Sequence, residues 1–533
     1  MKVNLCATNK QAVISKESMT DIGIFNLVRG FADSKYSDDE IAAFFNTYLT
    51  YDPEEIRYRS TILGYLSGVN SCKEKLADII AGCRRLLQSI KIIDDTFLRP
   101  LVAYTYKLRV LEEYMQTVEK TWQLFSGESD IPEITAISKM VQEQQQSQFY
   151  TQVQETVHQV RGMVERLDNV TLGVNFMDSG GEEPLRLGVV NVNSTSENIV
   201  GIFGHGGEKS NSLYDPAPVR VRGQLPHLED FILADVEKKW ARKLRAALRK
   251  LNKIDIDNII RWHNWLKHIY LYYSGLLFAD KIKPNEVFPP KPMDEAILSE
   301  GSFITAEEML NPYMAITDRK PVQQNLRFNL GETVMITGAN NSGKTTALKA
   351  FAQNCLLAQL GFWIPVRSFK FMTFKKWFTV FSAGEDDQFQ ASRFQQEAEQ
   401  MRKAINHAES GDCLLLNEPF TSTNPVEAAE LLRDVVVELN LKGVTLFFVT
   451  HNFEVYPLLN DIPTVQIRSY VTRVEIDGEK VKYQYVLEEK APDGLSFARA
   501  LAREYGLTID NMINDPDNLQ ALEKFITEGN AYA

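Results

Sequence analysis

Long hydrophobic runs are missing from this sequence. The longest apolar stretches, such as residues 355–361, stop well short of the roughly 20 residues that a helix needs to cross a bilayer. Residues 1–15 lack the basic start and the long apolar block of a secretory signal. Hydrophobic residues make up 44% and charged residues 24% of the chain, an ordinary globular balance. The sequence therefore predicts a soluble, cytoplasmic protein.

Cysteine and positive charge are also scarce. The five cysteines are scattered without the spacing of a metal site, which fits a reducing compartment: Cys6, Cys72, Cys83, Cys355 and Cys413. The chain has 58 Lys and Arg residues against 70 Asp and Glu residues, a net charge of −12. This balance argues against a uniformly basic nucleic-acid binder, but it permits a local basic face.

The N-terminal region has the pattern of successive helices. A chain of 533 residues predicts about three or four domains, because one core rarely serves so many residues. Three helix start signals occur early: capping boxes at Ser37 with Glu40 and at Ser71 with Glu74, and the Asp52-Pro53 cap and first turn. We expect helices from about residue 37 to 90 and a longer helix over 96–125.

The segment 132–167 is rich in Gln, Glu and Val and has little Gly or Pro to stop a helix. A single helix of about 36 residues would be ~54 Å long, too long to pack wholly inside a small globule. We therefore expect an arm or lever. Two helices with an unmarked break are the alternative.

The periodicity changes between residues 170 and 226, which predicts a small β-containing insertion. Three short β-like runs lie there: 170–176, 185–192 and 218–221. A helical pattern then covers about 227–280, with an interruption near Ile254. Four prolines follow, which cannot continue a helix: Pro284, Pro289, Pro290 and Pro292. We place the main domain boundary at these prolines.

Beyond the prolines, strands and helices alternate from about residue 324 to 466, the pattern of a parallel sheet covered by helices. A short apolar run ends at Thr337, and a helix is expected over 346–360. The loop between them matches Gly-x4-Gly-Lys-Ser/Thr, the Walker A pattern, and is followed by Thr346: Gly338, Ala339, Asn340, Asn341, Ser342, Gly343, Lys344 and Thr345. The pattern therefore lies between strand and helix, as a phosphate-binding loop requires.

Each residue type in this loop has a role in binding ATP with Mg²⁺. Glycines let backbone N–H groups close around phosphates, and the helix N-terminus adds positive potential. Lys344 reaches the outer phosphates and the Thr345 hydroxyl ligates Mg²⁺. A chance Gly-Lys turn before a core helix is the alternative, but it would not require strand, loop and helix in this order.

Polar residues end two further strands. Asn417-Glu418 follows a strand at 413–416, where the acidic second element of such a site is expected. The Asn417 amide keeps an oxygen acceptor but lacks the charge of a carboxylate, so we expect weaker metal binding. Glu418 is the candidate to orient or deprotonate the attacking water. His451 ends the strand at 444–449, and it either has a structural role or, as we favour, lies near the γ-phosphate.

These segments resemble the nucleotide-binding domain of the MutS group of DNA mismatch-repair ATPases. The resemblance is most specific over about 330–460, and weaker similarity covers about 49–280. It rests on the following residues: 337–346, 356–361 with Pro365, Asn417-Glu418 with 421–423, 449–454, Asp386-Asp387, and 392–394 with Glu397.

The resemblance implies an ATPase that works as a dimer, because in related ATPases the signature segment, here including Ser392, is presented to the nucleotide of the partner subunit. Val322 and Asn325 lie in a segment similar to the one that contacts adenine. Two departures bear on hydrolysis and on cross-subunit geometry, since Asn417 replaces an Asp and Gln390 replaces a Gly.

The resemblance also bears on recognition and domains. The chain begins almost at the helical core of the family and has no Phe-x-Glu in its N-terminal region, so mismatch recognition by a base wedge is not expected. The expected parts are a helical core domain at 1–128, a lever or clamp-like region at 129–283 with a β insertion at about 170–226, a Pro-rich linker at 284–300, an α/β P-loop ATPase domain at 301–510, and a tail at 511–533.

A dense basic run lies on the helix expected after residue 227. It consists of Lys238, Lys239, Arg242, Lys243, Arg245, Arg249, Lys250 and Lys253. Such a run could bind DNA phosphates in a salt-dependent way. It could equally be the solvated side of a helix whose apolar stripe includes Trp240 and Leu244. The resemblance favours DNA binding, by backbone or shape rather than by base sequence.

Two hypotheses follow. The first is a homodimeric, MutS-like DNA-binding ATPase, in which ATP closes the nucleotide domains and the long helices transmit that closure to duplex or branched DNA. The second is a switch that binds ATP, hydrolyses it slowly because of Asn417, and acts on a protein partner. A transporter-type ATPase is disfavoured, because the sequence has no Leu-Ser-Gly-Gly-type signature.

Overall fold

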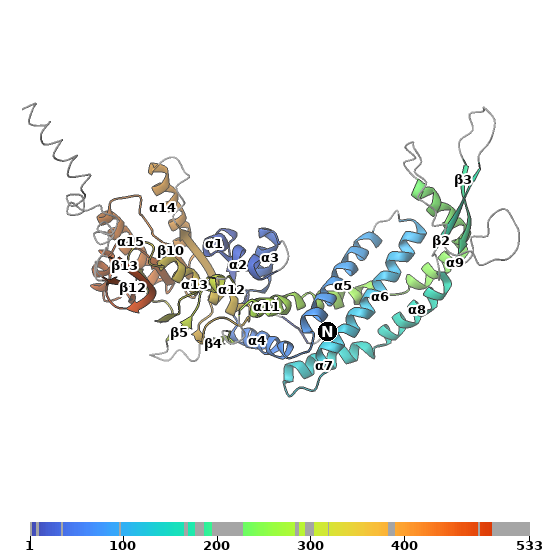
Figure 1. The fold of residues 1–533 in the computed structure, drawn as a ribbon, viewed down its shortest axis with the longest axis horizontal. Helices are drawn as coiled ribbons and strands as arrows, with labels where there is room; N and C mark the ends of the chain where they lie inside the picture. The colour runs from blue at the N-terminus through green and yellow to red at the C-terminus, as the bar shows by residue number, and fades with distance from the viewer. Residues whose placement is uncertain are drawn as a thin grey trace, which may run out of the picture. The chain divides into compact units, whose positions relative to one another are not determined.

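The computed structural model describes twelve segments of the chain (Figure 1), residues 3–6, 10–32, 36–94, 98–164, 169–175, 186–193, 228–282, 287–293, 303–317, 319–381, 390–477 and 480–492. The chain divides into two compact units. The helical unit contains residues 1–5 and 74–269, and the sheet unit contains residues 6–73 and 270–533.

The helical unit is built from long helices around a buried aromatic centre. The helices that the structure describes are α5 (Cys72–Ile93), α6 (Pro100–Phe125), α7 (Pro132–Gln145), α8 (Gln148–Val164), α9 (Leu228–Leu251) and α10 (Ile256–Leu266). Tyr114 of α6 and Trp262 of α10 meet edge to face, with ring centroids 6.4 Å apart. The indole Nε1 of Trp262 donates to Thr117 Oγ1 at 3.0 Å, so the buried indole is satisfied.

The single helix predicted over 132–167 is wrong, and the alternative of two helices is observed. α7 ends at Gln145 and α8 begins at Gln148. The hydroxyl of Ser147 accepts a hydrogen bond from the backbone N–H of Tyr150 at 3.1 Å, as an N-cap does. The break is therefore stabilised by a serine cap, without the Gly or Pro that would have marked it in the sequence.

The structure tests the three helix start signals of the N-terminal region. The capping box of Ser37 and Glu40 is confirmed, and so is Asp52, whose side chain accepts from Glu54 N. Ser71 differs from the prediction, because its backbone has φ 52° rather than the extended conformation of an N-cap.

The predicted β insertion contains an antiparallel hairpin, β2 (Asn169–Asn175) with β3 (Arg186–Asn193). The third predicted β-like run, 218–221, lies outside the described residues. The interruption near Ile254 is confirmed, since Asp255 caps α10. A second break, not predicted, separates α10 from α11 (Ile269–Lys281).

The sheet unit is organised around a seven-stranded sheet with the order β1-β9-β10-β11-β7-β12-β13. All neighbouring strands are parallel except β12 and β13, which confirms the predicted parallel α/β architecture. The strands are β1 (Val13–Ile14), β7 (Thr333–Thr337), β9 (Lys376–Phe381), β10 (Cys413–Asn417), β11 (Thr445–Val449), β12 (Ile467–Asp477) and β13 (Lys480–Glu489). The central strands β7, β10 and β11 are almost wholly buried, as their apolar runs predict.

A second sheet and several helices complete the sheet unit. The four-stranded sheet has the order β4 (Lys291–Pro292), β8 (Ser368–Phe371), β5 (Ile304–Met309) and β6 (Gln324–Phe328). Besides α11, the helices are α1 (Lys16–Ile22), α2 (Ile24–Phe31), α3 (Asp38–Tyr48), α4 (Pro53–Ser67), α12 (Pro312–Ile316), α13 (Lys344–Gln359), α14 (Gln390–His407), α15 (Pro425–Leu441) and α16 (Val455–Asn460).

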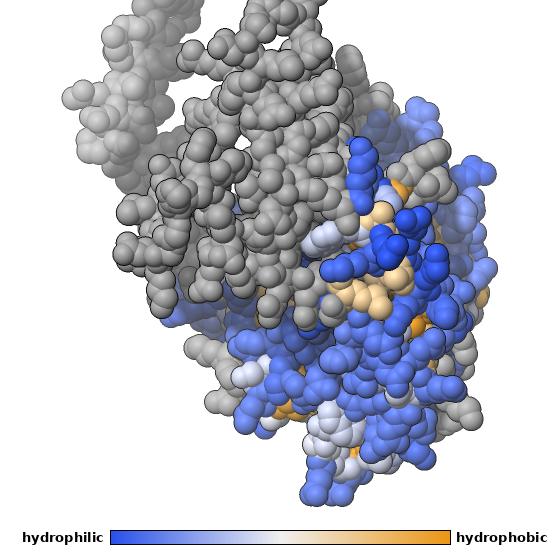
Figure 2. Space-filling view, turned by 90° about the vertical axis from the view of Figure 1, so that its right-hand side faces the viewer, coloured by the Kyte–Doolittle hydropathy of each residue, from blue (hydrophilic) through white to orange (hydrophobic). Residues whose placement is uncertain are grey.

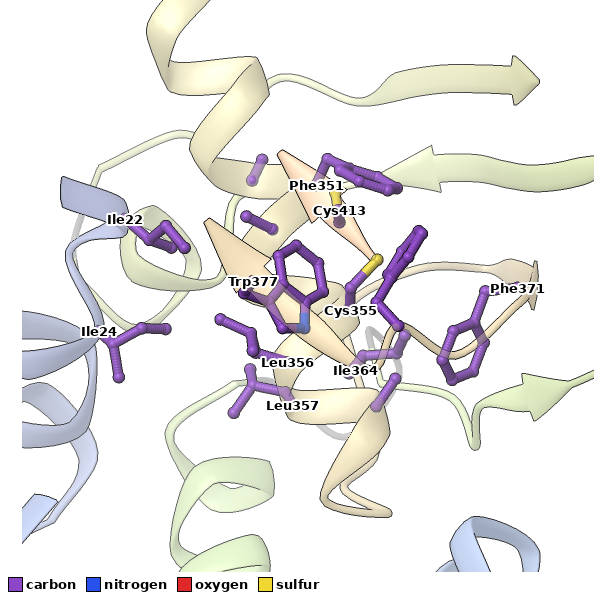
Figure 3. Packing of buried hydrophobic residues seen from close by; sticks show 14 of the residues in the cluster. Ile22, Ile24, Phe351, Cys355, Leu356, Leu357, Ile364, Phe371, Trp377 and Cys413 are labelled. Atoms are coloured by element: carbon purple, nitrogen blue, oxygen red, sulfur yellow. The ribbon is translucent and has the colours of Figure 1, made fainter. Parts of the chain in front are cut away.

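Helix α13, which follows the glycine-rich loop, lies in the middle of the main hydrophobic core. Figure 3 shows its Phe351, Cys355, Leu356 and Leu357 among side chains of the sheet and of α1 and α2. The Phe351 ring stacks on Phe447 of β11 with centroids 4.2 Å apart. Burial on several sides explains why the helix shows no clear amphipathic pattern, since its amides Gln353, Asn354 and Gln359 are buried together with its apolar side chains.

Two buried amides of α13 tie the N-terminal segment to the sheet unit. Gln353 Nε2 donates to the carbonyl of Ile22, and Gln359 Nε2 donates to the carbonyl of Thr50, each at 2.9 Å. β1 adds an edge strand to the sheet beside β9. Residues 6–73 therefore belong to the sheet unit, whereas the sequence pattern predicted a separate helical domain at 1–128.

The Pro-rich stretch also differs from its predicted role. Pro292 pairs with Phe371 in the second sheet, and the nearest boundary between the two units falls between residues 269 and 270. A proline can take part here because β4 is an edge strand. The predicted tail at 511–533 lies outside the described residues.

Among the described residues, no helix is both long enough and apolar enough to cross a membrane. On the face shown in Figure 2, the described surface is mostly hydrophilic. The five cysteines are unbridged and buried.

Candidate nucleotide site

The glycine-rich loop takes backbone conformations that only glycine adopts easily. Gly338 has φ 140°, and Gly343, the N-cap of α13, has φ 91°. A Cβ on Gly338 would lie 1.8 Å from Thr472 Oγ1. The same threonine hydroxyl donates to Ser342 Oγ at 2.6 Å, so β12 supports the loop from behind.

Lys344 lies inside this loop, at the first position of α13. Its side chain is 5% exposed, and its ammonium donates to the carbonyls of Gly338 and Ala339 at 3.0 Å each. The ammonium also lies 3.5 Å from the Glu418 carboxylate. Burial lowers the pKa of Lys344, and the charge of Glu418 partly offsets that effect. The lysine is therefore held in place by groups of its own chain.

Thr345 meets the end of β10. Its hydroxyl donates to Asn417 Oδ1 at 2.7 Å. Asn417 is the last residue of β10, which pairs with both β9 and β11 in the middle of the sheet. The Asn417 side chain thus presents an oxygen acceptor beside the threonine hydroxyl, at the position where the sequence predicted one.

Glu418 and His451 form a hydrogen-bonded pair next to the loop. Glu418 Oε2 lies 2.7 Å from His451 Nδ1 and accepts from His451 N at 3.2 Å. Burial raises the pKa of Glu418, but the His451 hydrogen bond and the charge of Lys344 outweigh it, so the pKa is lowered overall. The hydrogen bond to Glu418 raises the pKa of His451, against a smaller opposing effect of burial. The pair therefore favours a carboxylate and an imidazolium.

A pocket of about 780 Å³ opens above the loop. Its described lining is Asn311, Met314, Lys320, Val322, Gln324, residues 340–347, Ala350, Glu418 and Tyr485. The volume is in the usual range of small-molecule sites. Residues 340–346 and Val322, which the sequence singled out, are therefore at one pocket, while Asn417 and His451 reach it through Thr345 and Glu418.

The expected contact of Asn325 with the base is not found. Asn325 is absent from the described lining of the pocket, and its Oδ1 accepts from the backbone N–H of Glu308 at 2.9 Å. Successive residues of a strand point to opposite faces, so the buried Gln324 lies on the pocket side and Asn325 is exposed.

Tyr485 is a pocket residue that the sequence analysis missed. It belongs to β13, has φ 58°, and keeps 45% of its surface exposed. Gln324 Nε2 donates to its carbonyl, and a Cβ on Gly343 would lie 3.1 Å from its ring. Only the pairing of distant strands brings this ring to the loop, so no local motif could have indicated it.

The signature-like segment is only partly described. Residues 382–389 and the side chains of Gln390 and Ser392 lie outside the description, so the predicted contact of Ser392 with a partner's nucleotide is not addressed. Phe394 and Glu397 of α14 are described, and both contact Phe420, two residues after Glu418.

The basic run lies on α9 and just beyond it. The side chains of Lys238, Arg242, Lys243, Arg245, Arg249 and Lys253 are exposed, Lys250 is half-buried and donates to Gln159, and the side chain of Lys239 is outside the description. Leu244, Ala247 and Leu251 are buried, which confirms the apolar stripe. The arrangement fits a solvated helix face and a phosphate-binding face equally well.

Comparisons with known proteins add independent information. Residues 334–525 match the family model for MutS domain V. The chain is 28% identical over 189 residues to the DNA mismatch repair protein MutS of Exiguobacterium sp., covering 35% of this chain and 21% of the relative. It is 22% identical over 361 residues to that of Lysinibacillus sphaericus, covering 65% and 40%, and 25% identical over 334 residues to that of Flavobacterium johnsoniae, covering 57% and 37%. The chain spans less than half the length of these relatives.

Proposed function

We infer, from its place in the MutS family and from the pocket above its phosphate loop, that this chain is a DNA-linked ATPase. It binds ATP with Mg²⁺, hydrolyses it, and uses the nucleotide to open and close a dimeric clamp on DNA. The work belongs to mismatch repair or recombination in the cytoplasm, on duplex or branched DNA rather than on a particular base sequence.

One observation carries this proposal. Lys344, Thr345 and Glu418 line a single pocket, and Asn417 and His451 are hydrogen-bonded to two of them. These groups come from the ends of three neighbouring parallel strands, β7, β10 and β11, where the ligand sites of such sheets form. A chance Gly-Lys turn would not assemble a hydroxyl, an amide oxygen, a carboxylate and an imidazole around one lysine.

The donors present fit a magnesium ion that arrives with its nucleotide. Among the described residues, no group of three or more His, Cys, Asp and Glu side chains is arranged to hold a metal by itself. Mg²⁺ commonly takes one or two protein oxygens and completes its shell with phosphates and water. The Thr345 hydroxyl and Asn417 Oδ1, 2.7 Å apart, would supply two such oxygens, and the neighbouring Glu418 carboxylate would add negative charge beside the ion. Bound Mg²⁺ would neutralise charge on the outer phosphates.

The remaining residues have separate tasks. Backbone N–H groups of residues 338–346 surround the phosphates, and Lys344 binds the outer ones. Glu418, with its lowered pKa, is a carboxylate at neutral pH and orients the attacking water. His451 holds that carboxylate and lies at the γ-phosphate side. Val322 and the Tyr485 ring provide the apolar and aromatic surface for the base.

The proposal also assigns residues to a dimer contact and to a DNA contact. Ser392 would complete the nucleotide site of a second subunit in trans. The exposed basic side chains of α9 would contact DNA phosphates. Both assignments depend on the family resemblance more than on the geometry of this chain.

A second candidate function rests on Asn417. An amide leaves the magnesium side of the pocket without the carboxylate that would hold the ion's water shell. A protein with this site could bind ATP, hydrolyse it slowly, and signal the bound state to a protein partner. The two functions differ in whether turnover is fast and whether DNA changes it.

The test measures ATP turnover by the full chain with and without duplex, mismatched and branched DNA, at low and high salt. Lys344→Ala should lower kcat/KM by about 1000-fold, because the outer phosphates lose their cation in binding and in the transition state. Asn417→Asp should raise turnover at limiting Mg²⁺ severalfold. The DNA-linked ATPase is supported if turnover depends on Lys344 and DNA changes it in a salt-sensitive way.

The opposite results are equally informative. Tight ATP binding with negligible turnover, restored by Asn417→Asp and indifferent to every DNA, would favour the interaction switch. Exchange of Lys370, a lysine of the second sheet, for alanine serves as the matched control and should leave turnover unchanged.

A further inference from the structure

A carboxylate on α14 holds the loop that carries Glu418. Glu397 Oε1 accepts a hydrogen bond from the backbone N–H of Phe420 at 2.6 Å. The Phe394 ring, on the same face of α14 three residues earlier, lies 6.2 Å from the Phe420 ring. One charged hydrogen bond and one aromatic contact therefore join this helix to the turn after β10.

The turn itself is strained. Glu418 has φ 52° and Phe420 has φ 59°, both in the left-handed region that residues with a Cβ disfavour. Such conformations persist where surrounding contacts hold them. Pro419 lies between the two, and its ring fixes φ, so few soft torsions separate Phe420 from Glu418. Holding the N–H of Phe420 therefore restricts the backbone of Glu418.

The other side of the turn is anchored on β11. The backbone N–H of Glu418 donates to the carbonyl of Val449 at 2.9 Å, and its carboxylate meets His451. A small rotation of the turn would move this carboxylate away from the pocket. Glu397 is half-buried, so desolvation of its charge costs free energy, which a neutral acceptor in a purely structural contact would avoid.

We propose that Glu397 is a positioning residue of the nucleotide site, which holds the left-handed turn 418–420 and thereby fixes the Glu418 carboxylate at the pocket. Its effect on hydrolysis rests on the ATPase function proposed above, whereas its effect on the turn does not. The segment that resembles the family signature lies at the start of α14. The hydrogen bond from Phe420 to Glu397 therefore connects this helix to the turn that carries the Glu418 carboxylate.

Two variants and a control separate positioning from folding. Glu397→Ala removes the acceptor, whereas Glu397→Gln keeps an oxygen at the same place. Glu399→Ala changes an exposed glutamate on the same helix. Thermal melting of all three shows whether the full chain still folds.

The first readout is residue-resolved hydrogen exchange, which needs no turnover. In Glu397→Ala the amides of Phe420 and Glu418 should both exchange at least about tenfold faster, while Glu397→Gln and Glu399→Ala should stay within about threefold of the parent. Unchanged exchange, or faster exchange at Phe420 alone, would overturn the proposal, since Glu418 would then be held without Glu397.

The second readout is steady-state kinetics. Glu397→Ala should lower kcat by about tenfold and leave KM for ATP within about twofold, and Glu397→Gln should recover most of kcat. If turnover in the parent depends on Lys344 and Glu397→Ala keeps the parental kcat, then Glu397 does not affect hydrolysis and that part of the proposal is overturned. If the parent shows no Lys344-dependent turnover, the ATPase function fails, and the exchange of the Glu418 and Phe420 amides alone decides the role of Glu397.

Discussion

The phosphate-loop pocket and the basic face of α9 are both rich in charge, yet they hold it in different ways. In the pocket, Lys344 is 5% exposed and its ammonium is bonded to two backbone carbonyls. On α9, the side chains of Arg242 and Arg249 are exposed to solvent. Fixed, buried groups interact with a ligand at short distances, so their effect depends on exact positions. Exposed charges act over longer distances and are screened by salt.

This difference predicts how the two regions respond to mutation. In the pocket, Lys344, Thr345 and Glu418 each make a specific hydrogen bond within the chain, so displacing one of them breaks a defined contact. The exposed α9 side chains act mainly through their charge, which another helix with the same charge would supply equally well. Mutations should therefore act sharply in the pocket and gradually on α9.

After Lys344→Ala, the largest effect in this comparison is expected for Glu418→Gln. Gln keeps the size of the side chain but removes the charge that orients water in the proposed function, so kcat should fall by about 100-fold or more while ATP still binds. Turnover and nucleotide binding measured on the same preparation separate the two effects. Glu430→Gln on the exposed side of α15 is the matched control. Near-parental kcat in Glu418→Gln would remove Glu418 from the chemistry.

An intermediate effect is expected for the triple change of Arg242, Arg245 and Arg249 to Ser. If these arginines meet phosphates, the slope of log affinity against log salt should fall by up to about 3, since each contact on duplex DNA contributes about 0.9. Basal ATP turnover should not change. The control replaces three exposed cations elsewhere in the helical unit by Ser: Lys91, Arg109 and Lys139. An equal loss in both triples would mean that net charge, not the α9 face, attracts DNA.

Whether a feature could be predicted from the sequence depends on whether its residues lie close together in the chain or far apart. The glycine-rich loop and Glu418 follow short strands whose inner residues are all apolar, and Asn417 ends one of these strands, so their positions could be inferred from short segments. Tyr485 and the contact from Glu397 to Phe420 could not, because each depends on which distant elements the fold brings together.

In the helical regions, some helix ends could be predicted from the sequence and others could not. The Ser37 capping box was predictable because both partners lie within one turn. The break at Ser147 was not, since a serine cap inside a Gln-rich run resembles any polar helix position. Likewise, the two-residue strand β1 is too short to carry a periodic signal, so no pattern in residues 6–73 indicated that they pack against the sheet.

The smallest effect is expected from the Glu418 and His451 pair, which tests how far the pocket behaves as a fixed site. The pKa of His451 is raised in the folded chain, so its contribution to stability is complete below the ordinary value of 6.5 and is lost as pH rises through the raised value. The pKa of Glu418 is lowered, so its contribution is present above the ordinary value of 4.5 and is lost as pH falls through the lowered value.

The pair should therefore stabilise the protein most between these two ordinary values. Because 56% of the His451 side chain is exposed, solvent screening should keep the gain below about 1 kcal/mol. The difference in Tm between the parent and His451→Gln should thus be largest at mildly acidic pH and shrink toward pH values well above 6.5. A difference that grows with pH would mean that His451 is neutral in this contact, and that the carboxylate is held by the loop and Lys344 rather than by an ion pair.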